Sequence, residues 1–113
     1  MYQVRFTPEA VKDVKAFPKN FRNSLKKEFQ KLAADPLGRS LQLREPLPGW
    51  RSYHWRNYRI IFMVFEDLQT IAVGAVGKRR PGSQTDVYRK LERLVQEGKL
   101  AEKVLKTVRE FSA

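Results

Sequence analysis

Hydrophobic and polar residues alternate over residues 2–6, in the pattern of a half-buried β-strand. Thr7, Pro8 and Glu9 follow: a hydroxyl that can cap free amides, a proline suited to the first helical position, and an acid near the positive end of the helix dipole. Apolar residues then recur every three or four positions up to Asp35, interrupted once by Pro18. The pattern predicts one strand followed by a helical hairpin.

Residues 37–49 are rich in proline and glycine and read as a connector. Three segments rich in aromatic and β-branched residues come next, at 50–56, 58–65 and 70–78. We interpret them as three antiparallel strands. The second is apolar on both faces beyond Arg59, so it is expected at the centre of the sheet.

The last third of the chain is expected to be helical. Asp86 can cap a helix whose apolar stripe continues to Val95, and Gly98 can end it. A final amphipathic segment covers residues 100–111, and its apolar side must be buried against something. It can cover the sheet of the same chain, form a dimer contact, or lie beside the functional site and limit access to it; the first needs no partner.

The fold class that follows is α+β: an N-terminal strand, a helical hairpin, a three-stranded antiparallel meander that completes a small twisted sheet, and one or more C-terminal helices. With 113 residues, the chain can build one compact domain and is too short for two. We therefore expect a single domain over residues 1–113, with a core at about 2–91 and a C-terminal helical extension at about 92–113.

The net charge of the chain indicates which class of molecule it binds. The chain has 23 Lys and Arg against 12 Asp and Glu, a formal net charge of +11. That excess favours a polyanion, with nucleic acid first and an acidic protein second, over a role in solubility alone, because so much like charge destabilises the fold by self-repulsion.

Several classes of site are excluded by composition. The chain has no cysteine, which rules out disulfides, thiolate catalysis and cysteine-based zinc sites, and its one histidine, His54, cannot build a multi-histidine metal site. No metal and no cofactor are expected. No window approaches the roughly 18 apolar residues of a membrane span, and no signal-length apolar core is found near the N-terminus. We therefore expect a soluble, cytoplasmic protein that does not bind membranes.

Three segments resemble the RelE/ParE toxin family, and their order along the chain is more specific than any one of them. They are Val4-Arg5-Phe6-Thr7-Pro8-Glu9-Ala10, then Trp50-Arg51-Ser52-Tyr53-His54-Trp55-Arg56-Asn57-Tyr58-Arg59-Ile60-Ile61-Phe62, then Val76-Gly77-Lys78-Arg79-Arg80 followed by Asp86-Val87-Tyr88. The resemblance implies a RelE-like fold over most of residues 2–91.

The same resemblance implies a toxin of a type II toxin–antitoxin system: a metal-independent endoribonuclease that cleaves mRNA on the ribosome and so inhibits translation. It also implies a cognate antitoxin as partner, with the toxin as a homodimer or within a toxin–antitoxin hetero-oligomer. Cleavage beside a 2′-hydroxyl needs a group to take its proton, cations on the phosphoryl oxygens, and a group to protonate the leaving 5′ oxygen.

Three residues match the family's catalytic positions. Arg59 stands where the family places an arginine at the start of the central strand, and Arg79 where it places another near the end of the next strand. Alternation puts each on one face of its strand, and in a shared antiparallel sheet those faces can coincide. Tyr88 matches an aromatic hydroxyl after the last strand, which can stack on a base or take part in proton transfer; each of the three could instead be structural.

The sequence departs from the family before Arg59, where well-known nuclease members carry two lysines and this chain has Ser52 and His54. His54 is the candidate base, because its ordinary pKa lies near neutrality. The alternative is a histidine hydrogen-bonded at the edge of an aromatic cluster. Ser52 is interpreted as structural.

Four further cations flank the proposed site in sequence and could hold RNA phosphates, or form a solvated rim: Arg51, Arg56, Lys78 and Arg80. Trp50 and Trp55 resemble stacking platforms for bases but are more often core residues in a small β-rich domain.

Two other functions remain open at this point. One is a toxin of the ParE branch that inhibits DNA gyrase without cutting RNA, and the other is an inactive domain that only binds its antitoxin. The arrangement of Arg59, Arg79 and Tyr88 favours the nuclease, and the missing lysines keep the alternatives open.

Overall fold

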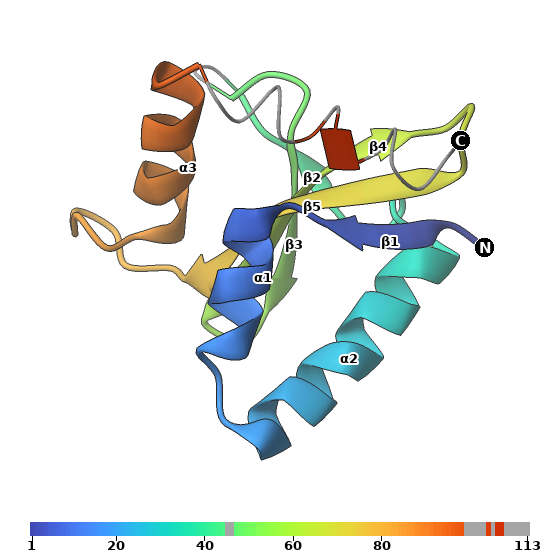
Figure 1. The fold of residues 1–113 in the computed structure, drawn as a ribbon, viewed down its shortest axis with the longest axis horizontal. Helices are drawn as coiled ribbons and strands as arrows, with labels where there is room; N and C mark the ends of the chain where they lie inside the picture. Colours follow the sequence, from blue (N-terminus) through green and yellow to red (C-terminus); the bar gives the residue numbers. More distant parts are fainter. Residues whose placement is uncertain (45–46, 99–103, 105, 108–113) are drawn as a thin grey trace.

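The computed structural model describes residues 1–44, 47–98, 104 and 106–107. Three helices and five strands are assigned in this part of the chain, in the predicted order (Figure 1). Their bounds are β1 (Gln3–Phe6), α1 (Pro8–Lys15), α2 (Lys19–Ala34), β2 (Leu41–Gln42), β3 (Arg51–Trp55), β4 (Tyr58–Phe65), β5 (Thr70–Lys78) and α3 (Val87–Gln96).

The strands form one sheet in the order β1-β5-β4-β3-β2. β1 runs parallel to β5, and the pairs β5–β4, β4–β3 and β3–β2 are antiparallel. β4 lies at the centre with a neighbour on each side, as its apolar character predicted. The α+β fold class and the three-stranded meander are thereby confirmed.

The helical hairpin begins as the sequence predicted. Thr7 caps α1, because its hydroxyl accepts a hydrogen bond from the Ala10 amide at 3.3 Å, and Pro8 occupies the first turn. α2 starts directly after Pro18. Together the two helices cover one face of the sheet, where Leu25 and Phe29 pack with buried residues of β3, β4 and β5.

The opposite face is covered by α3, and Figure 1 shows α2 and α3 on opposite sides of the sheet. Asp86 caps this helix and Gly98 follows its end with a left-handed φ of 72°, both as predicted. The core here includes Trp50 and Leu91 and also Val104, which is 2% exposed. At this described position the C-terminal segment covers the chain's own sheet; most of the predicted stripe at 100–111 lies outside the described residues.

A β-bulge shapes the centre of the second face. Ile61 pairs with Ala75 while Phe62 pairs with Val73, so Gly74 is an extra residue in β5. A Cβ atom at Gly74 would lie 2.6 Å from a ring carbon of Trp50. The glycine therefore makes room for the Trp50 ring, which is a buried core residue as the sequence favoured.

Asp13 of α1 fastens the helices to the open edge of β5. β1 pairs with β5 only as far as Val73, and the Asp13 carboxylate accepts the amide of Val76 at 3.0 Å beyond that point. The same carboxylate forms an ion pair with Lys90 of α3. One side chain thus links both helix layers to the strand that leads to the functional site. Within the described part of the chain, no helix is long and apolar enough to cross a membrane.

Candidate functional site

The candidate residues lie near the end of β3, the start of β4 and the end of β5, on one face of the sheet. His54 pairs with Arg59, and Arg59 pairs with Gly77 on its other side. Directly paired residues share a face of the sheet, and Arg79 shares it too because it lies two residues after Gly77. This is the α3 face, since a Cβ at Gly77 would lie 3.2 Å from Val87 of that helix. The predicted coincidence of the Arg59 and Arg79 faces is thus seen in the structure.

Arg79 is held in place by both its backbone and its side chain. Its amide donates to the Asn57 carbonyl at 2.8 Å, which extends the β5–β4 ladder by one residue. Its guanidinium donates to the Asp86 carboxylate at 2.6 Å and lies over the Tyr88 ring, with 4.7 Å from the guanidinium carbon to the ring centroid. Arg79 therefore sits in one orientation beside Tyr88.

Asp86 is the residue that fixes the entry to α3. Its carboxylate accepts hydrogen bonds from the Arg79 side chain and from the amides of Arg80 and Tyr88. Burial alone would raise the pKa of Asp86, but these hydrogen bonds and the Arg79 charge outweigh burial and lower that pKa below its ordinary value. The carboxylate therefore stays ionised and keeps Arg79 and the start of α3 together.

The Tyr88 hydroxyl points down onto the sheet. It lies 2.8 Å from the hydroxyl of Ser52, which is 1% exposed on β3. The Tyr88 side chain is half-buried beside the apolar stripe of α3, with its ring toward the sheet. Ser52 thereby takes a positioning role at the site that sequence reasoning missed, because its partner is 36 residues away in sequence.

His54 and Arg59 complete the cluster. The Arg59 guanidinium donates to the Tyr58 carbonyl at 2.9 Å and to the Arg56 carbonyl at 3.4 Å. Its Nε is buried and has no hydrogen-bond partner among the described residues. Burial, and then the positive charge of Arg59, lower the pKa of His54 below its ordinary value. This shift favours the neutral imidazole, which is the form that can accept a proton.

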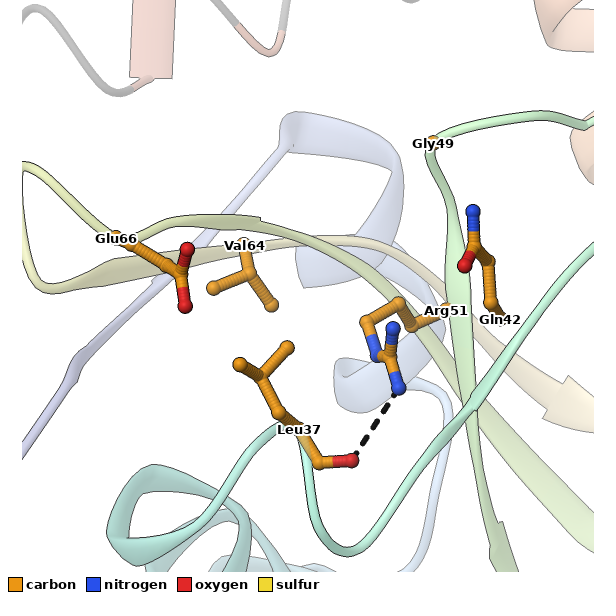
Figure 2. Close-up of a pocket in the computed structure, with 6 residues that line it drawn as sticks. All are labelled: Leu37, Gln42, Gly49, Arg51, Val64 and Glu66. Atoms are coloured by element: carbon orange, nitrogen blue, oxygen red, sulfur yellow. Dashed lines mark hydrogen bonds between the residues drawn. The ribbon is translucent and has the colours of Figure 1, made fainter.

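The four flanking cations are not all placed at this cluster. Arg51 lies one residue before Ser52 and so on the other face, where its guanidinium donates to Ser40 Oγ at 2.7 Å and to the Leu37 carbonyl at 3.2 Å. Figure 2 shows Arg51 in this contact, beside a cavity of about 220 Å³ that Val64 also lines. Arg51 thus holds the connector that follows α2.

Lys78 and Arg80 also face away from the cluster, because they alternate with Arg79 along the end of β5. Both line a cavity with Phe17 on the α1 side. Arg56 occupies the exposed turn between β3 and β4 with a left-handed φ of 54°, its guanidinium carbon 5.3 Å from the Trp55 ring centroid. The expectation that all four flank one site is therefore not what the geometry shows.

Chemically, the cluster offers two guanidiniums, a neutral imidazole and a phenol on one face. Among the described residues, no group of three or more His, Asp or Glu side chains could hold a metal ion. The arrangement fits chemistry on a phosphate diester, where cations stabilise the phosphoryl oxygens and an imidazole and a phenol transfer protons.

Comparison with known sequences identifies the family. Residues 4–81 match the family described as ParE toxin of type II toxin-antitoxin system, parDE, which is well over half of the chain. The chain belongs to the ParE toxin family. Membership of the RelE/ParE superfamily makes it a toxin of a type II toxin–antitoxin system. No protein with a curated description matches the sequence.

Solved structures of the superfamily share the fold of this ParE-family toxin. The RelBE2 toxin–antitoxin complex from Mycobacterium tuberculosis is 28% identical, over 69% of this chain and 98% of that chain, with a TM-score of 0.65. The isolated RelE toxin of E. coli is 20% identical, over 84% of this chain and 99% of that one, with a TM-score of 0.59. YafQ from E. coli strain BL21(DE3) is 19% identical, over 69% and 93%, with a TM-score of 0.55. The RelE-like fold expected from the sequence is confirmed.

Proposed function

We propose that this toxin is a metal-independent endoribonuclease that cleaves mRNA on the ribosome and thereby inhibits translation. The observation that carries the proposal is the gathering of His54, Arg59, Arg79 and Tyr88 on one face beneath α3. Each residue type has a task in cleavage next to a 2′-hydroxyl.

In the proposed reaction, the neutral imidazole of His54 takes the proton of the 2′-hydroxyl, whose oxygen then attacks the neighbouring phosphorus. Arg59 and Arg79 stabilise the negative charge that grows on the phosphoryl oxygens. The bond to the 5′ oxygen breaks, and the Tyr88 hydroxyl gives that oxygen its proton. Tyr88 then recovers a proton from solvent, and the His54 imidazolium releases its proton to solvent, which restores both groups. The products are a cyclic 2′,3′-phosphate and a free 5′-hydroxyl.

Ser52 and Asp86 prepare the site for this reaction. Ser52 fixes the direction of the Tyr88 hydroxyl, and Asp86 fixes Arg79 against the Tyr88 ring. A bound phosphate would share the Arg79 guanidinium with Asp86. Because a guanidinium has five N–H donors, it can donate to both groups.

A cognate antitoxin is part of the proposal. The solved relatives include the RelBE2 complex of a toxin with its antitoxin. The formal net charge of +11 on this chain suits an acidic protein partner as well as RNA.

The test is primer extension on a translated message after expression of the wild-type toxin and of Arg79→Ala and Tyr88→Phe. We expect discrete cuts with wild type. Loss of Arg79 should slow cleavage by about 10²–10³-fold, because a preorganised charge on the phosphoryl oxygens is lost. Loss of the Tyr88 hydroxyl should slow it by at least about tenfold, because the leaving oxygen loses its proton donor while the ring stays in place.

Lys27→Ala is the matched control, since it removes one charge from the exposed side of α2, far from the cluster in sequence. It should cleave like wild type. Intact messages in cells whose growth has stopped would overturn the nuclease proposal, as would undiminished cutting by both site variants.

A second candidate is inhibition of DNA gyrase, which the match to the ParE family favours. It predicts replication arrest with intact messages, and growth inhibition that survives Tyr88→Phe. A supercoiling assay with purified gyrase and purified toxin separates it from the nuclease.

A further inference from the structure

A second cavity lies at the end of β5, on the face opposite His54 and Tyr88. Its volume is about 320 Å³, and it is lined by the end of α1, the first residue of β4, the end of β5 and the loop before α3. The side chains with chemistry in this lining are Asp13, Phe17, Tyr58, Lys78, Arg80 and Thr85. None of them takes part in the cleavage proposed above.

The charge of this cavity is positive. Lys78 is half-buried there, and within the described ranges no residue accepts a hydrogen bond from its ammonium group. The Arg80 side chain is equally without an acceptor among those residues. The carboxylate of Asp13 already serves Lys90 and the Val76 amide, so it leaves the two cations without a counter-charge. Such a pair is suited to a phosphate.

The aromatic wall of the cavity is rigid. Phe17 and Tyr58 meet edge to face, with ring centroids 5.5 Å apart and planes at 84°. Behind them, Phe21 lies 5.0 Å from the Tyr58 ring and 4.8 Å from the Phe17 ring. Half-buried rings that are supported in this way offer a surface on which a nucleobase can pack without sequence preference.

The edge of β5 adds a polar element to the cavity. The Val76 amide points outward to Asp13, and alternation along the strand turns the peptide of Lys78 to the same edge. β1 does not reach this part of β5, since its pairing ends at Val73. The peptide of Lys78 is therefore placed to meet the polar edge of a base.

We propose that this cavity is a nucleotide subsite for the RNA segment next to the scissile bond, with its phosphate on Lys78 and Arg80 and its base against Phe17 and Tyr58. The inference rests on the proposed nuclease function. Arg79 lies between Lys78 and Arg80 in the chain, so an RNA strand that crosses the end of β5 meets cations on both faces in succession.

The location of binding can be read directly. A 2′-O-methylated single-stranded tetraribonucleotide, which cannot be cleaved, is titrated into ¹⁵N-labelled toxin while amide shifts are followed. We expect saturable shifts at Phe17, Lys78 and Thr85 in addition to those around Tyr88. Shifts confined to the Tyr88 face, or no saturable shift at millimolar RNA, would overturn the subsite.

Affinity and its salt dependence supply the second readout, with Lys78→Gln and Arg80→Gln compared with Lys27→Gln, which makes the same charge change on α2. Each subsite variant should weaken binding by about three- to tenfold and reduce the slope of log K against log salt by about 0.7, the value for one phosphate contact on a single strand. Equal effects of all three variants would show a general charge effect and contradict the proposal.

These experiments need no cleavage, so they are independent of the nuclease assay. Cleavage with RNA shifts only on the Tyr88 face would leave the nuclease standing and remove the subsite. Saturable shifts at Lys78 with no cleavage of any message would leave an RNA-binding cavity and remove the nuclease.

Discussion

His54 owes its protonation state to its surroundings, and chiefly to burial and the facing Arg59. Both disfavour the imidazolium form, so the pKa of His54 lies below its ordinary value of about 6.5. At a pH where an unperturbed histidine would be half-charged, a larger fraction of His54 is therefore neutral and able to act as a base. In the proposed reaction, its position opposite Arg59 allows a histidine to take the place of the family's lysine as base.

The pH dependence of cleavage follows from that shift. If His54 is the base, the single-turnover rate should rise with pH as the imidazole loses its proton and reach a plateau, with its midpoint below about 6.5. The measurement is the rate on a ribosome-bound message between pH 5 and 8, for wild type and His54→Gln. The variant should be slower and lose this limb of the profile; an unchanged profile in His54→Gln would assign the base to another group.

Two positioning residues of the cluster could not be predicted from the sequence. Ser52 was interpreted as structural, and its contact with Tyr88 depends on how α3 crosses the sheet. Asp86 was predicted as a helix cap, which is a local property, but its bond to Arg79 needs the path of the intervening loop. Local sequence pattern can predict a helix cap or the alternation of side chains along a strand. It cannot predict which elements lie close to one another in the fold.

At the scale of elements, α3 is the part that must be placed accurately, since it carries Tyr88. It packs so closely on β5 that a Cβ atom at Gly77 would lie 3.2 Å from Val87, which is tighter than an ordinary contact. On its other side, Lys90 reaches Asp13 of α1. The helix is thus fixed to the strand by packing and to α1 by charge.

Removing that fastening should be visible in both stability and activity. Asp13→Ala leaves the Val76 amide and the Lys90 ammonium without their partner, and we expect a loss of about 1–3 kcal/mol in the free energy of unfolding. Urea unfolding measures the loss, and hydrogen exchange at the Val76 amide should quicken. Asp67→Ala, in the exposed turn after β4, is the control and should change stability by less than about 0.5 kcal/mol. An Asp13→Ala protein as stable as wild type would contradict this role.

The elements themselves were largely predictable, and the reason is local. β4 and β5 have the predicted bounds, and both predicted helix starts have the expected caps. The prediction that four cations flank one site, in contrast, did not match the geometry. Arg51 precedes Ser52, and Lys78 and Arg80 flank Arg79, so period-2 alternation already assigned them to the other face. This alternation was visible in the sequence, but the cations were grouped with the candidate residues because they are their neighbours in the chain.

At the scale of the whole molecule, the protein is a sheet buried on both faces. One core lies under α1 and α2 and the other under α3, and β4 contributes Ile60 and Phe62 to the first and Ile61 to the second. All three side chains are fully buried. Local sequence pattern could not predict that β1, the first strand in chain order, pairs in parallel with β5, the last described strand.

That architecture predicts the order in which amides become accessible to solvent. Opening β4 requires both cores to separate, so the amides of Ile60, Ile61 and Phe62 should exchange only through global unfolding. Those of α3 should exchange through smaller openings, because that helix contacts one face only. Native-state hydrogen exchange at increasing denaturant tests this, and α3 amides that match β4 in protection would contradict it.

Asp86 is a single position at which a mutation would affect several parts of the candidate site at once. One carboxylate holds Arg79, the Arg80 amide and the first turn of α3, while the two cores are built from other residues. A substitution there removes the contacts that hold Arg79 and the first turn of α3. The gene of such a descendant would still encode a chain matching the family over residues 4–81, because Asp86 lies beyond that segment. A comparison limited to residues 4–81 would therefore not distinguish a chain that has lost Asp86 from one that keeps it.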